Sequence, residues 1–376
     1  MLLRVQQLNY IEESHMALPF FNSGARKQRD RMLAVDLGSR TTKAVHVQRR
    51  GHGYALCGYA ILDTPVFNKS LSAELLGEHL KAVAEALETK SKAVTLTIGP
   101  NDALVRHTEM PRLLVDDMRL VLKHNSRTYL QQDMANHVFD CHVLTAAAPD
   151  QPPKATEALK APPGAPKRKV LVAAARKEQI DEFVEGARRA GLVVESIVPS
   201  LIGPVNAFEK AMPEVFEKEA VALVDLGFKN SSICIVQQGE LILSRVVAIG
   251  GDRLTSGLAE ALSISYAEAE GIKIGMPSEV QQQLESFLIP LGRELRASID
   301  FFEHQQDRPV THVFVTGGTA RSDFILQTLQ REMLIGCKLL DPTSFLHLEL
   351  PPRQTVEIQQ VASQLTVAVG AALAAL

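Results

Sequence analysis

The 376-residue chain contains no tryptophan, aromatic residues make up only 5% of it, and its net charge is −3. Proteins that bind single-stranded nucleic acid stack the bases on aromatic side chains, and nucleic-acid binders in general carry a basic surface. The sequence shows neither feature, so nucleic acid is not expected as a partner. The apolar fraction of 46% and the charged fraction of 22% are typical of a globular protein.

Cysteine is also rare, and no C-x-x-C pair occurs. The four cysteines are far apart in the chain, at Cys57, Cys141, Cys234 and Cys337. This spacing predicts reduced, packed thiols in a reducing cytoplasm rather than disulfides. The eleven histidines form no H-E-x-x-H motif, and His137 and His142 are interpreted as surface residues rather than as metal ligands.

No apolar run approaches the roughly 18 residues that span a bilayer. The longest, LTVAVGAALAAL at residues 365–376, is short and rich in small residues, and it predicts a packed helix. The beginning of the chain lacks the order of a signal peptide. Residues 1–31 are predicted to be an N-terminal extension or tail, in which 1–15 are of doubtful relevance. The basic cluster after residues 18–21 favours a flexible tail over a contact with an acidic membrane surface.

One local plan occurs twice in the sequence. Residues 32–47, MLAVDLGSRTTKAVHV, and residues 221–236, VALVDLGFKNSSICIV, each contain an apolar run, Asp-Leu-Gly, small polar residues and a second apolar run. A third strand is expected after each pair, beyond a glycine turn at 51–53 and at Gly239. A strand plan that recurs half a chain apart predicts two lobes of similar architecture.

Between and after these repeats, predicted strands alternate with amphipathic helices, which indicates an α/β protein. The helices are expected near residues 72–90, 113–131, 177–191, 200–212, 255–274 and 281–304. The stretch PDQPPKATEALKAPPGAPKRK, which begins at Pro149, is dense in proline, alanine and lysine, and it predicts an exposed loop.

The two Asp-Leu-Gly turns have the chemistry of a phosphate clamp. Glycine lets another group approach the backbone closely, and consecutive turn N–H groups form a positive nest for phosphate oxygens. An aspartate beside such a turn repels phosphate but suits a hydrated Mg²⁺ that bridges to it. The predicted ligands are Gly38, Ser39, Thr41, Lys43, Gly227, Asn230 and Ser231 for phosphate, with Asp36 and Asp225 for Mg²⁺.

A strand follows each turn, whereas P-loop and Rossmann motifs need a helix there, so those two folds are excluded. With these residues the chain resembles the actin-like ATPase superfamily, whose five motifs all have counterparts here in order. The resemblance implies ATP and Mg²⁺ as cofactors. It assigns AEAEGIK, with Glu270 and Lys273, to the ribose and adenine, and VFVTGGTAR, with Gly317, Gly318 and Arg321, to the adenosine motif. AVGAALA near the end is similar to the second connecting helix.

Within the superfamily the chain resembles the PilM family of type IV pilus assembly proteins, relatives of the cell-division protein FtsA, over roughly residues 32–376. LTIGPNDALVRHTEMPRLLVDDM and VLVAAARKEQIDEFVEGARRAGLVVESI are similar to the start and end of the family's inserted subdomain 1C. The family usually has a Pro-Phe pair after the long helix of 1C. This chain has SRTYLQQDMAN there, so its 1C is expected to differ locally in shape.

The implied fold is a two-lobed α/β actin-like ATPase fold with an FtsA/PilM-type inserted subdomain 1C. The implied parts are an N-terminal extension (1–31), subdomain 1A (32–99), the inserted subdomain 1C (100–192), the return to 1A with the interlobe helix (193–212), the second lobe 2A/2B (213–355) and the C-terminal connecting helix (356–376).

The function that the resemblance implies is a cytoplasmic, ATP-binding scaffold of a type IV pilus or a related secretion machine, peripheral at the inner membrane. The implied partner is the N-terminal cytoplasmic peptide of a PilN-like inner-membrane protein, held between subdomains 1A and 1C. ALVRHTEM and HVFDCHVL are candidate strand edges for it. The membrane would be reached only through this partner, and self-association is left open.

No catalytic residue is predicted. In the heat-shock chaperone branch of the superfamily, a glutamate before the proline of the interlobe helix orients the attacking water, but here Val198 precedes Pro199. Slow hydrolysis at most is therefore expected.

Two alternatives to the scaffold function stay open. One is a small-molecule kinase of the same superfamily, although the chain shows no Asp-rich glycine loop that would supply a base. The other is an FtsA-like filament protein.

Overall fold

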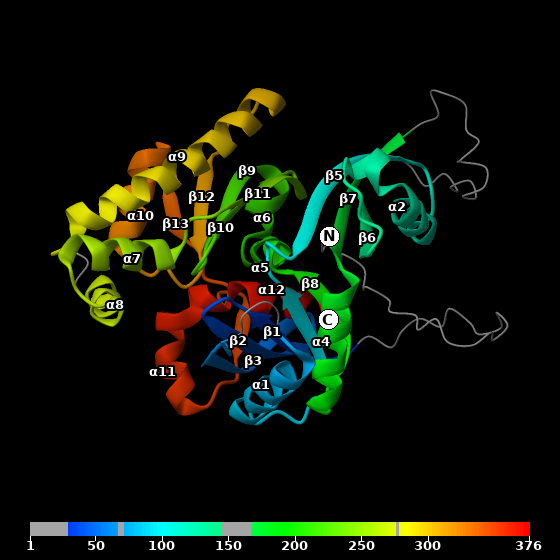
Figure 1. Ribbon diagram of the computed structural model, residues 1–376, viewed down its shortest axis with the longest axis horizontal. Helices are drawn as coiled ribbons and strands as arrows, with labels where there is room; N and C mark the ends of the chain where they lie inside the picture. The colour runs from blue at the N-terminus through cyan, green and yellow to red at the C-terminus, as the bar shows by residue number, and fades with distance from the viewer. Residues whose placement is uncertain (1–28, 67–70, 145–166, 276–277) are drawn as a thin grey trace.

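The computed structural model describes residues 29–66, 71–144, 167–275 and 278–376. These ranges form two sheet-centred lobes, one above the other in Figure 1, and a smaller three-stranded unit at the upper right. Residues 1–28 of the predicted extension and most of the proline-rich loop lie outside the described residues. Of the basic cluster, Arg29 pairs with Glu195, and Arg31 is the first residue of the strand Arg31–Leu37.

The lower lobe contains a six-stranded sheet in the order β14-β3-β2-β1-β4-β8 (Figure 1). Its strands are β1 (Arg31–Leu37), β2 (Thr41–Arg50), β3 (Gly53–Asp63), β4 (Ala93–Ile98), β8 (Val193–Pro199) and β14 (Leu346–Leu348). β1, β2 and β3 are antiparallel neighbours, whereas β4 runs parallel to β1. All six residues of β4 are buried, as expected for a parallel strand with both faces covered.

Helices cover both faces of this sheet. α1 (Ala73–Ala86) and α4 (Lys177–Arg189) pack against each other and share a core with β1, β4 and β8. α12 (Thr366–Ala375) shares the opposite core with β1, β2 and β3. α1 begins at the predicted cap, where Ser72 Oγ accepts a hydrogen bond of 3.4 Å from the Leu75 amide. The end of α4 is followed by Gly191 in the left-handed region, with a φ of +73°.

The upper lobe contains a five-stranded sheet in the order β11-β10-β9-β12-β13. Its strands are β9 (Ala220–Leu226), β10 (Ser231–Gln237), β11 (Glu240–Val247), β12 (His312–Thr316) and β13 (Cys337–Leu339). α7 (Gly251–Leu262), α9 (Gln281–Gln306) and α10 (Asp323–Met333) share a core with one face. α5 (Gly203–Ala211) and α6 (Pro213–Lys218) pack on the other face, and α8 (Tyr266–Gly275) packs on α7.

The predicted duplication is present in the two sheets. In each lobe an antiparallel hairpin carries the Asp-Leu-Gly turn, and a later strand lies parallel to its first strand, β4 beside β1 and β12 beside β9. Asp36 pairs in register with Lys43, and Asp225 pairs with Ser232. Each aspartate is also the penultimate residue of its strand.

The two helices that connect the lobes cross in close backbone contact. A Cβ added to Gly370 of α12 would collide with the carbonyl of Gly203 at the start of α5, and one added to Gly203 would lie 2.7 Å from the Cα of Val367. Asn206 Nδ2 donates to the Gly370 carbonyl at 3.3 Å. The short turns η1 (Ser200–Ile202) and η2 (Ala362–Leu365) precede the two helices. The small residues of AVGAALA thus permit the helix crossing between the lobes.

The small unit at the upper right of Figure 1 is inserted between β4 and β8 of the lower sheet. It consists of β5 (Ala103–Pro111), α2 (Val115–Leu130), β6 (His137–Val143) and β7 (Lys167–Arg176), with its own apolar core. Its strand order is β5-β7-β6, so both predicted candidate edges are outer strands. The chain then enters α4, which packs on the lower lobe rather than on this unit.

The inserted unit also contacts the upper lobe. Leu144 and Leu171 belong to the same buried cluster as Phe216 and Leu241 of that lobe. His107 Nε2 on β5 lies 2.7 Å from the carbonyl oxygen of Leu241 on β11, to which it donates. Burial lowers the pKa of His107, which favours the neutral imidazole in this contact. The inserted unit therefore contacts both lobes.

One helical stretch among the described residues, Pro352–Ala375, is long and apolar enough to cross a membrane by length and composition alone. It comprises α11 (Pro352–Val361), η2 and α12. Of its most apolar 18-residue window, 67% is buried inside the protein. The core helix of a soluble protein passes the same test, and α12 covers a sheet face as the sequence predicts.

Candidate functional site

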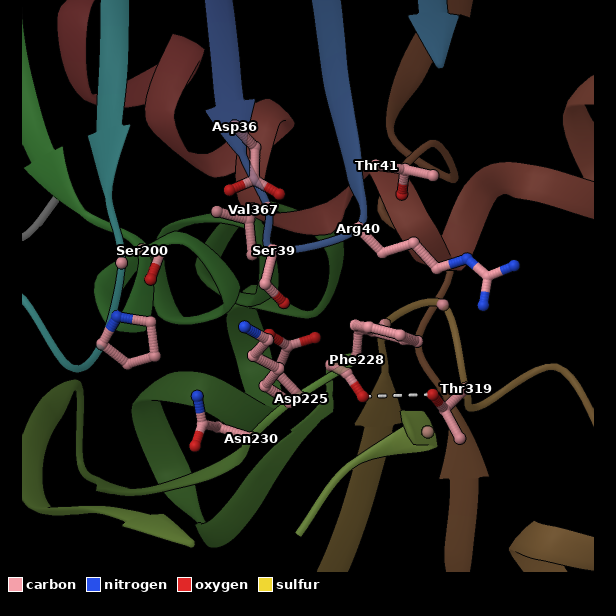
Figure 2. Close-up of a pocket in the computed structure, with 18 of the residues that line it drawn as sticks. Asp36, Ser39, Arg40, Thr41, Ser200, Asp225, Phe228, Asn230, Thr319 and Val367 are labelled. Carbon is pink, nitrogen blue, oxygen red and sulfur yellow. Dashed lines mark hydrogen bonds between the residues drawn. The ribbon is translucent and has the colours of Figure 1, made fainter. Parts of the chain in front are cut away.

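The turns after β1 and β9 face each other across a cleft between the lobes (Figure 2). The cleft has a volume of about 1060 Å³. Every residue predicted as a ligand contributes to its lining, which brings together positions from 36 to 321.

The first turn is held by its own backbone and by Thr64. The Gly38 amide donates to the Asp36 carbonyl at 3.0 Å, and Thr64 Oγ1 donates to the Gly38 carbonyl at 2.7 Å. A Cβ on Gly38 would lie 2.5 Å from the Thr41 carbonyl oxygen and 2.8 Å from Lys43 Nζ. Glycine therefore lets the turn fold back tightly and leaves room for the lysine.

The second turn has the same form. The Gly227 amide donates to the Asn230 carbonyl at 3.1 Å, and a Cβ on Gly227 would lie 2.6 Å from that oxygen. The predicted ligand Ser231 is buried, and its Oγ donates to the Ile249 carbonyl at 2.6 Å. In this structure its hydroxyl proton is therefore used to hold the turn against the segment that leads into α7.

Asp36 and Asp225 extend into the cleft from opposite sides (Figure 2). Asp36 Oδ1 accepts a hydrogen bond of 2.8 Å from Thr97 Oγ1, and its Oδ2 lies 3.8 Å from Lys43 Nζ. Burial and the charge of Asp36 raise the pKa of Asp225 to about 6, while Lys43 acts in the opposite direction. The repulsion between the carboxylates is what a bound cation would relieve.

The lining contributed by α7 and α8 is a polar network. Glu270 Oε2 accepts from Lys273 Nζ at 2.8 Å and from Thr255 Oγ1. Lys273 Nζ also donates to Thr255 Oγ1 at 2.7 Å and to the Gly251 carbonyl at 3.3 Å. Burial lowers the pKa of Lys273, and the hydrogen bonds from Lys273 and Thr255 outweigh burial to lower the pKa of Glu270. Both side chains are thus fixed in place by α7.

The glycine pair after β12 forms the remaining wall. Gly317 has a φ of +97°, and a Cβ there would lie 2.5 Å from Asp225 Oδ1 and 2.6 Å from the Leu226 carbonyl oxygen. Gly318 is exposed and would place its Cβ no closer than 3.7 Å to any neighbour. Thr319 Oγ1 donates to the Gly227 carbonyl at 3.2 Å, the bond drawn in Figure 2, and Arg321 lines the cleft.

Among the residues that the structure describes, no group of three or more histidine, cysteine, aspartate or glutamate side chains could hold a metal ion. The cleft offers two opposed carboxylates instead. Such a pair fits a cation that takes its remaining ligands from water and from phosphate, as Mg²⁺ does.

Comparison with known proteins assigns the family. The sequence profile described as type IV pilus assembly protein PilM matches residues 34–376. The chain belongs to the PilM family.

Solved structures support this PilM fold. A chain of the structure titled "PilM-PilN type IV pilus biogenesis complex" matches with a TM-score of 0.78 and 20% identity, covering 92% of this chain and 98% of that one. The ethanolamine utilization protein EutJ from Carboxydothermus hydrogenoformans matches with a TM-score of 0.53 and 16% identity, covering 91% of this chain and 88% of that one. These similarities confirm the predicted two-lobed actin-like fold.

The predicted relationship to FtsA is also found. The cell division protein FtsA of Bacillus subtilis (strain 168) is 32% identical over 97 residues, which cover 26% of this chain. The match spans only about a fifth (21%) of the length of that relative.

The structure adds residues in the cleft lining and behind it that the sequence did not indicate. Thr97 at the end of β4 holds Asp36, and Thr255 on α7 holds Glu270 and Lys273. Arg40 and Phe228, one in each turn, meet across the cleft. Thr97 could have been found from its place at the carboxyl end of a strand beside β1, the usual edge for ligands in α/β sheets.

We predict that Gly317→Ala destabilises this PilM-family chain, whereas Gly318→Ala does not. The first variant combines an unfavourable left-handed backbone with a Cβ 2.5 Å from Asp225 Oδ1, and the second meets neither obstacle. The expected loss in the free energy of unfolding is about 1–3 kcal/mol for Gly317→Ala and under about 0.5 kcal/mol for Gly318→Ala. Denaturant unfolding measures both values, and equal stabilities would contradict the assigned role of Gly317.

Proposed function

We propose that this PilM-family chain is a cytoplasmic scaffold that binds ATP with Mg²⁺ in the interlobe cleft and acts at the inner face of the membrane in type IV pilus assembly. The observation that carries the proposal is the pair of Asp-Leu-Gly turns, one from each lobe, that line one cleft. Family membership supports the pilus context.

The residues of the cleft fit the proposed ligand. The backbones of both turns, with Ser39, Thr41 and Asn230, would hold the phosphates, and Lys43 would add a positive charge. Asp36 and Asp225 would hold Mg²⁺ through water, and the bound ion would neutralise phosphate charge. Glu270 and Lys273, with the wall after β12, would hold the nucleoside.

The cleft favours binding over rapid turnover. The segment Val198–Pro199–Ser200 enters η1 at the cleft wall, and it provides no carboxylate or amide side chain that could polarise a water. The nucleotide would then act by fixing the angle between the lobes, and through it the affinity for a partner.

The proposed partner is the N-terminal cytoplasmic peptide of a PilN-like inner-membrane protein. Support comes from the structural neighbour, which is titled as a PilM–PilN complex, and from the two outer strands β5 and β6 of the inserted sheet. An extended peptide can add to such an edge while alternate side chains fill apolar pockets. Binding to this partner would place the scaffold at the membrane.

The inserted unit is well placed to respond to the nucleotide. It leaves the lower lobe between β4 and β8, and it contacts the upper lobe through His107 and the cluster around Leu144 and Leu171. The division predicted from the sequence, with subdomain 1C at 100–192 between parts of 1A and the second lobe at 213–355, is kept as part of this proposal except at two places. α4 packs on the lower lobe, and β14 pairs with β3 in the lower sheet.

The first prediction of the proposed function is that Lys43→Ala weakens Mg²⁺-dependent ATP binding. A hydrogen bond with a charged partner contributes about 1.5–3 kcal/mol, so Kd should rise about 10- to 150-fold. Lys229→Ala, which removes an exposed lysine from the other turn, is the matched control and should have a smaller effect. Asp36→Ala and Asp225→Ala should reduce the dependence on Mg²⁺. Equal affinities of wild type and Lys43→Ala in calorimetry would show that the phosphate clamp is wrongly placed.

The second prediction is slow hydrolysis. Because residues 198–200 supply no side chain to orient the attacking water, the isolated protein should turn over ATP far below the ~10 s⁻¹ median of enzymes. A steady-state phosphate-release assay measures the rate. A value above about 1 s⁻¹ without any partner would contradict the binding role.

The third prediction concerns the partner peptide, which should bind in the micromolar range because ordering a flexible segment offsets part of the contact energy. Ala103 and Ala175 are paired neighbours on β5 and β7, so residues 104–174 can be replaced by a short glycine linker with α4 retained. This variant should lose the peptide and keep ATP binding, which also shows that it is folded. Unchanged peptide affinity in an ATP-binding variant would refute the groove assignment.

A further inference from the structure

Three side chains from three different elements meet across the cleft. Arg40 lies in the turn between β1 and β2 of the lower lobe, and its guanidinium carbon is 5.1 Å from the centre of the Phe228 ring in the turn between β9 and β10. Its Nη1 is 3.4 Å from Oε1 of Glu270 on α8. In Figure 2 the Arg40 side chain lies above Phe228, one from each lobe. One lower-lobe cation therefore contacts two upper-lobe groups.

Arg40 is the one large side chain between Gly38 and Thr41 in the first turn, and Phe228 is the one aromatic side chain in the second turn. Beyond the turn backbones, the side chains proposed to hold the phosphates are Ser39, Thr41, Asn230 and Lys43, and the Phe228 ring has no hydrogen-bonding group that could join them. Because 40% of the Arg40 side chain is exposed, its guanidinium could point into solvent instead. Its position over an aromatic ring of the opposite lobe points to a role in holding the lobes together.

The contact with Glu270 is additional to what fixes that residue. Glu270 Oε2 is bonded by Lys273 and Thr255, and Arg40 approaches the other oxygen, Oε1. Removal of Arg40 therefore leaves the network on α7 and α8 complete. A variant at position 40 tests the contact between the lobes without dismantling the upper lobe.

We propose that Arg40, Phe228 and Glu270 form an interlobe clasp that sets how fast a nucleotide enters and leaves the cleft. The clasp rests on the proposed function in that the nucleotide is the ligand it retains. To open the cleft, the guanidinium must leave both the ring and the carboxylate, so the clasp adds to the barrier for release. A partly exposed cation–π contact of this kind changes such a rate about two- to fivefold.

Release of a fluorescent ATP analogue, followed by stopped flow with Mg²⁺, tests the clasp. Arg40→Met and Phe228→Leu should each accelerate release about two- to fivefold. The double variant should be no faster than the faster single variant, because both remove the same contact. Phe228→Trp, which keeps an aromatic face, should release at the wild-type rate or more slowly. Arg176→Met is the control, because this exposed cleft-lining arginine pairs with Asp102 near the base of the inserted unit, not with the upper lobe.

Two kinetic results would overturn the clasp. If Arg40→Met weakens binding more than tenfold while Phe228→Leu changes nothing, Arg40 contacts the phosphates instead. If the effects of the two variants on the release rate multiply in the double variant, the residues act independently.

A measurement on the ligand-free protein separates the clasp from the proposed function. The chain has no tryptophan, so Phe228→Trp introduces its only indole. Quenching of that indole by acrylamide should increase when Arg40→Met is added, because the guanidinium no longer covers the ring. Equal quenching in the two variants would overturn the clasp whether or not ATP binds. If the analogue does not bind at all, the proposed function fails, and quenching alone decides the clasp.

Discussion

The arrangement of this protein depends on two carboxylates that face each other across one cleft. Each lies in the same local structure, in which a β-strand ends at an Asp-Leu-Gly turn and an antiparallel second strand follows. Burial raises the pKa of Asp225, and the charge of Asp36 across the cleft raises it further, so ionising both carboxylates is unfavourable in the protein alone. A cation with a polyphosphate would offset that cost.

The elements between the lobes explain how such a ligand could change the molecule. α5 and α12 cross with their backbones in contact at Gly203 and Gly370, a compact crossing that we propose as the hinge between the lobes. The inserted sheet reaches from the lower lobe to Leu241 of the upper lobe through His107. In this account, nucleotide contacts at the turns and peptide contacts at the inserted sheet are linked because both depend on the angle between the lobes.

Much of the fold could be predicted from sequence because its signals are local. The duplicated turns, the cap at Ser72 and the small residues of α12 are each specified by a few neighbouring residues, and the structure agrees with them. β13 and β14, with three residues each, are too short to show an alternating pattern. The contacts between site residues depend on how the strands and lobes are placed, which no local pattern specifies. Thr97 contacts Asp36 only because β4 lies beside β1, and Arg40 meets Phe228 only because the lobes face each other.

The central claim is that one ATP molecule with Mg²⁺ bridges both turns. Hydrogen exchange of the intact protein, with and without saturating Mg²⁺ and ATP, tests this directly, because it reports each turn separately. The account predicts slower amide exchange in the peptides that cover residues 36–43, 225–232 and 317–321 together, and the effect should disappear when Mg²⁺ is chelated. Protection confined to one lobe, or none in either turn at saturating ATP, would contradict it.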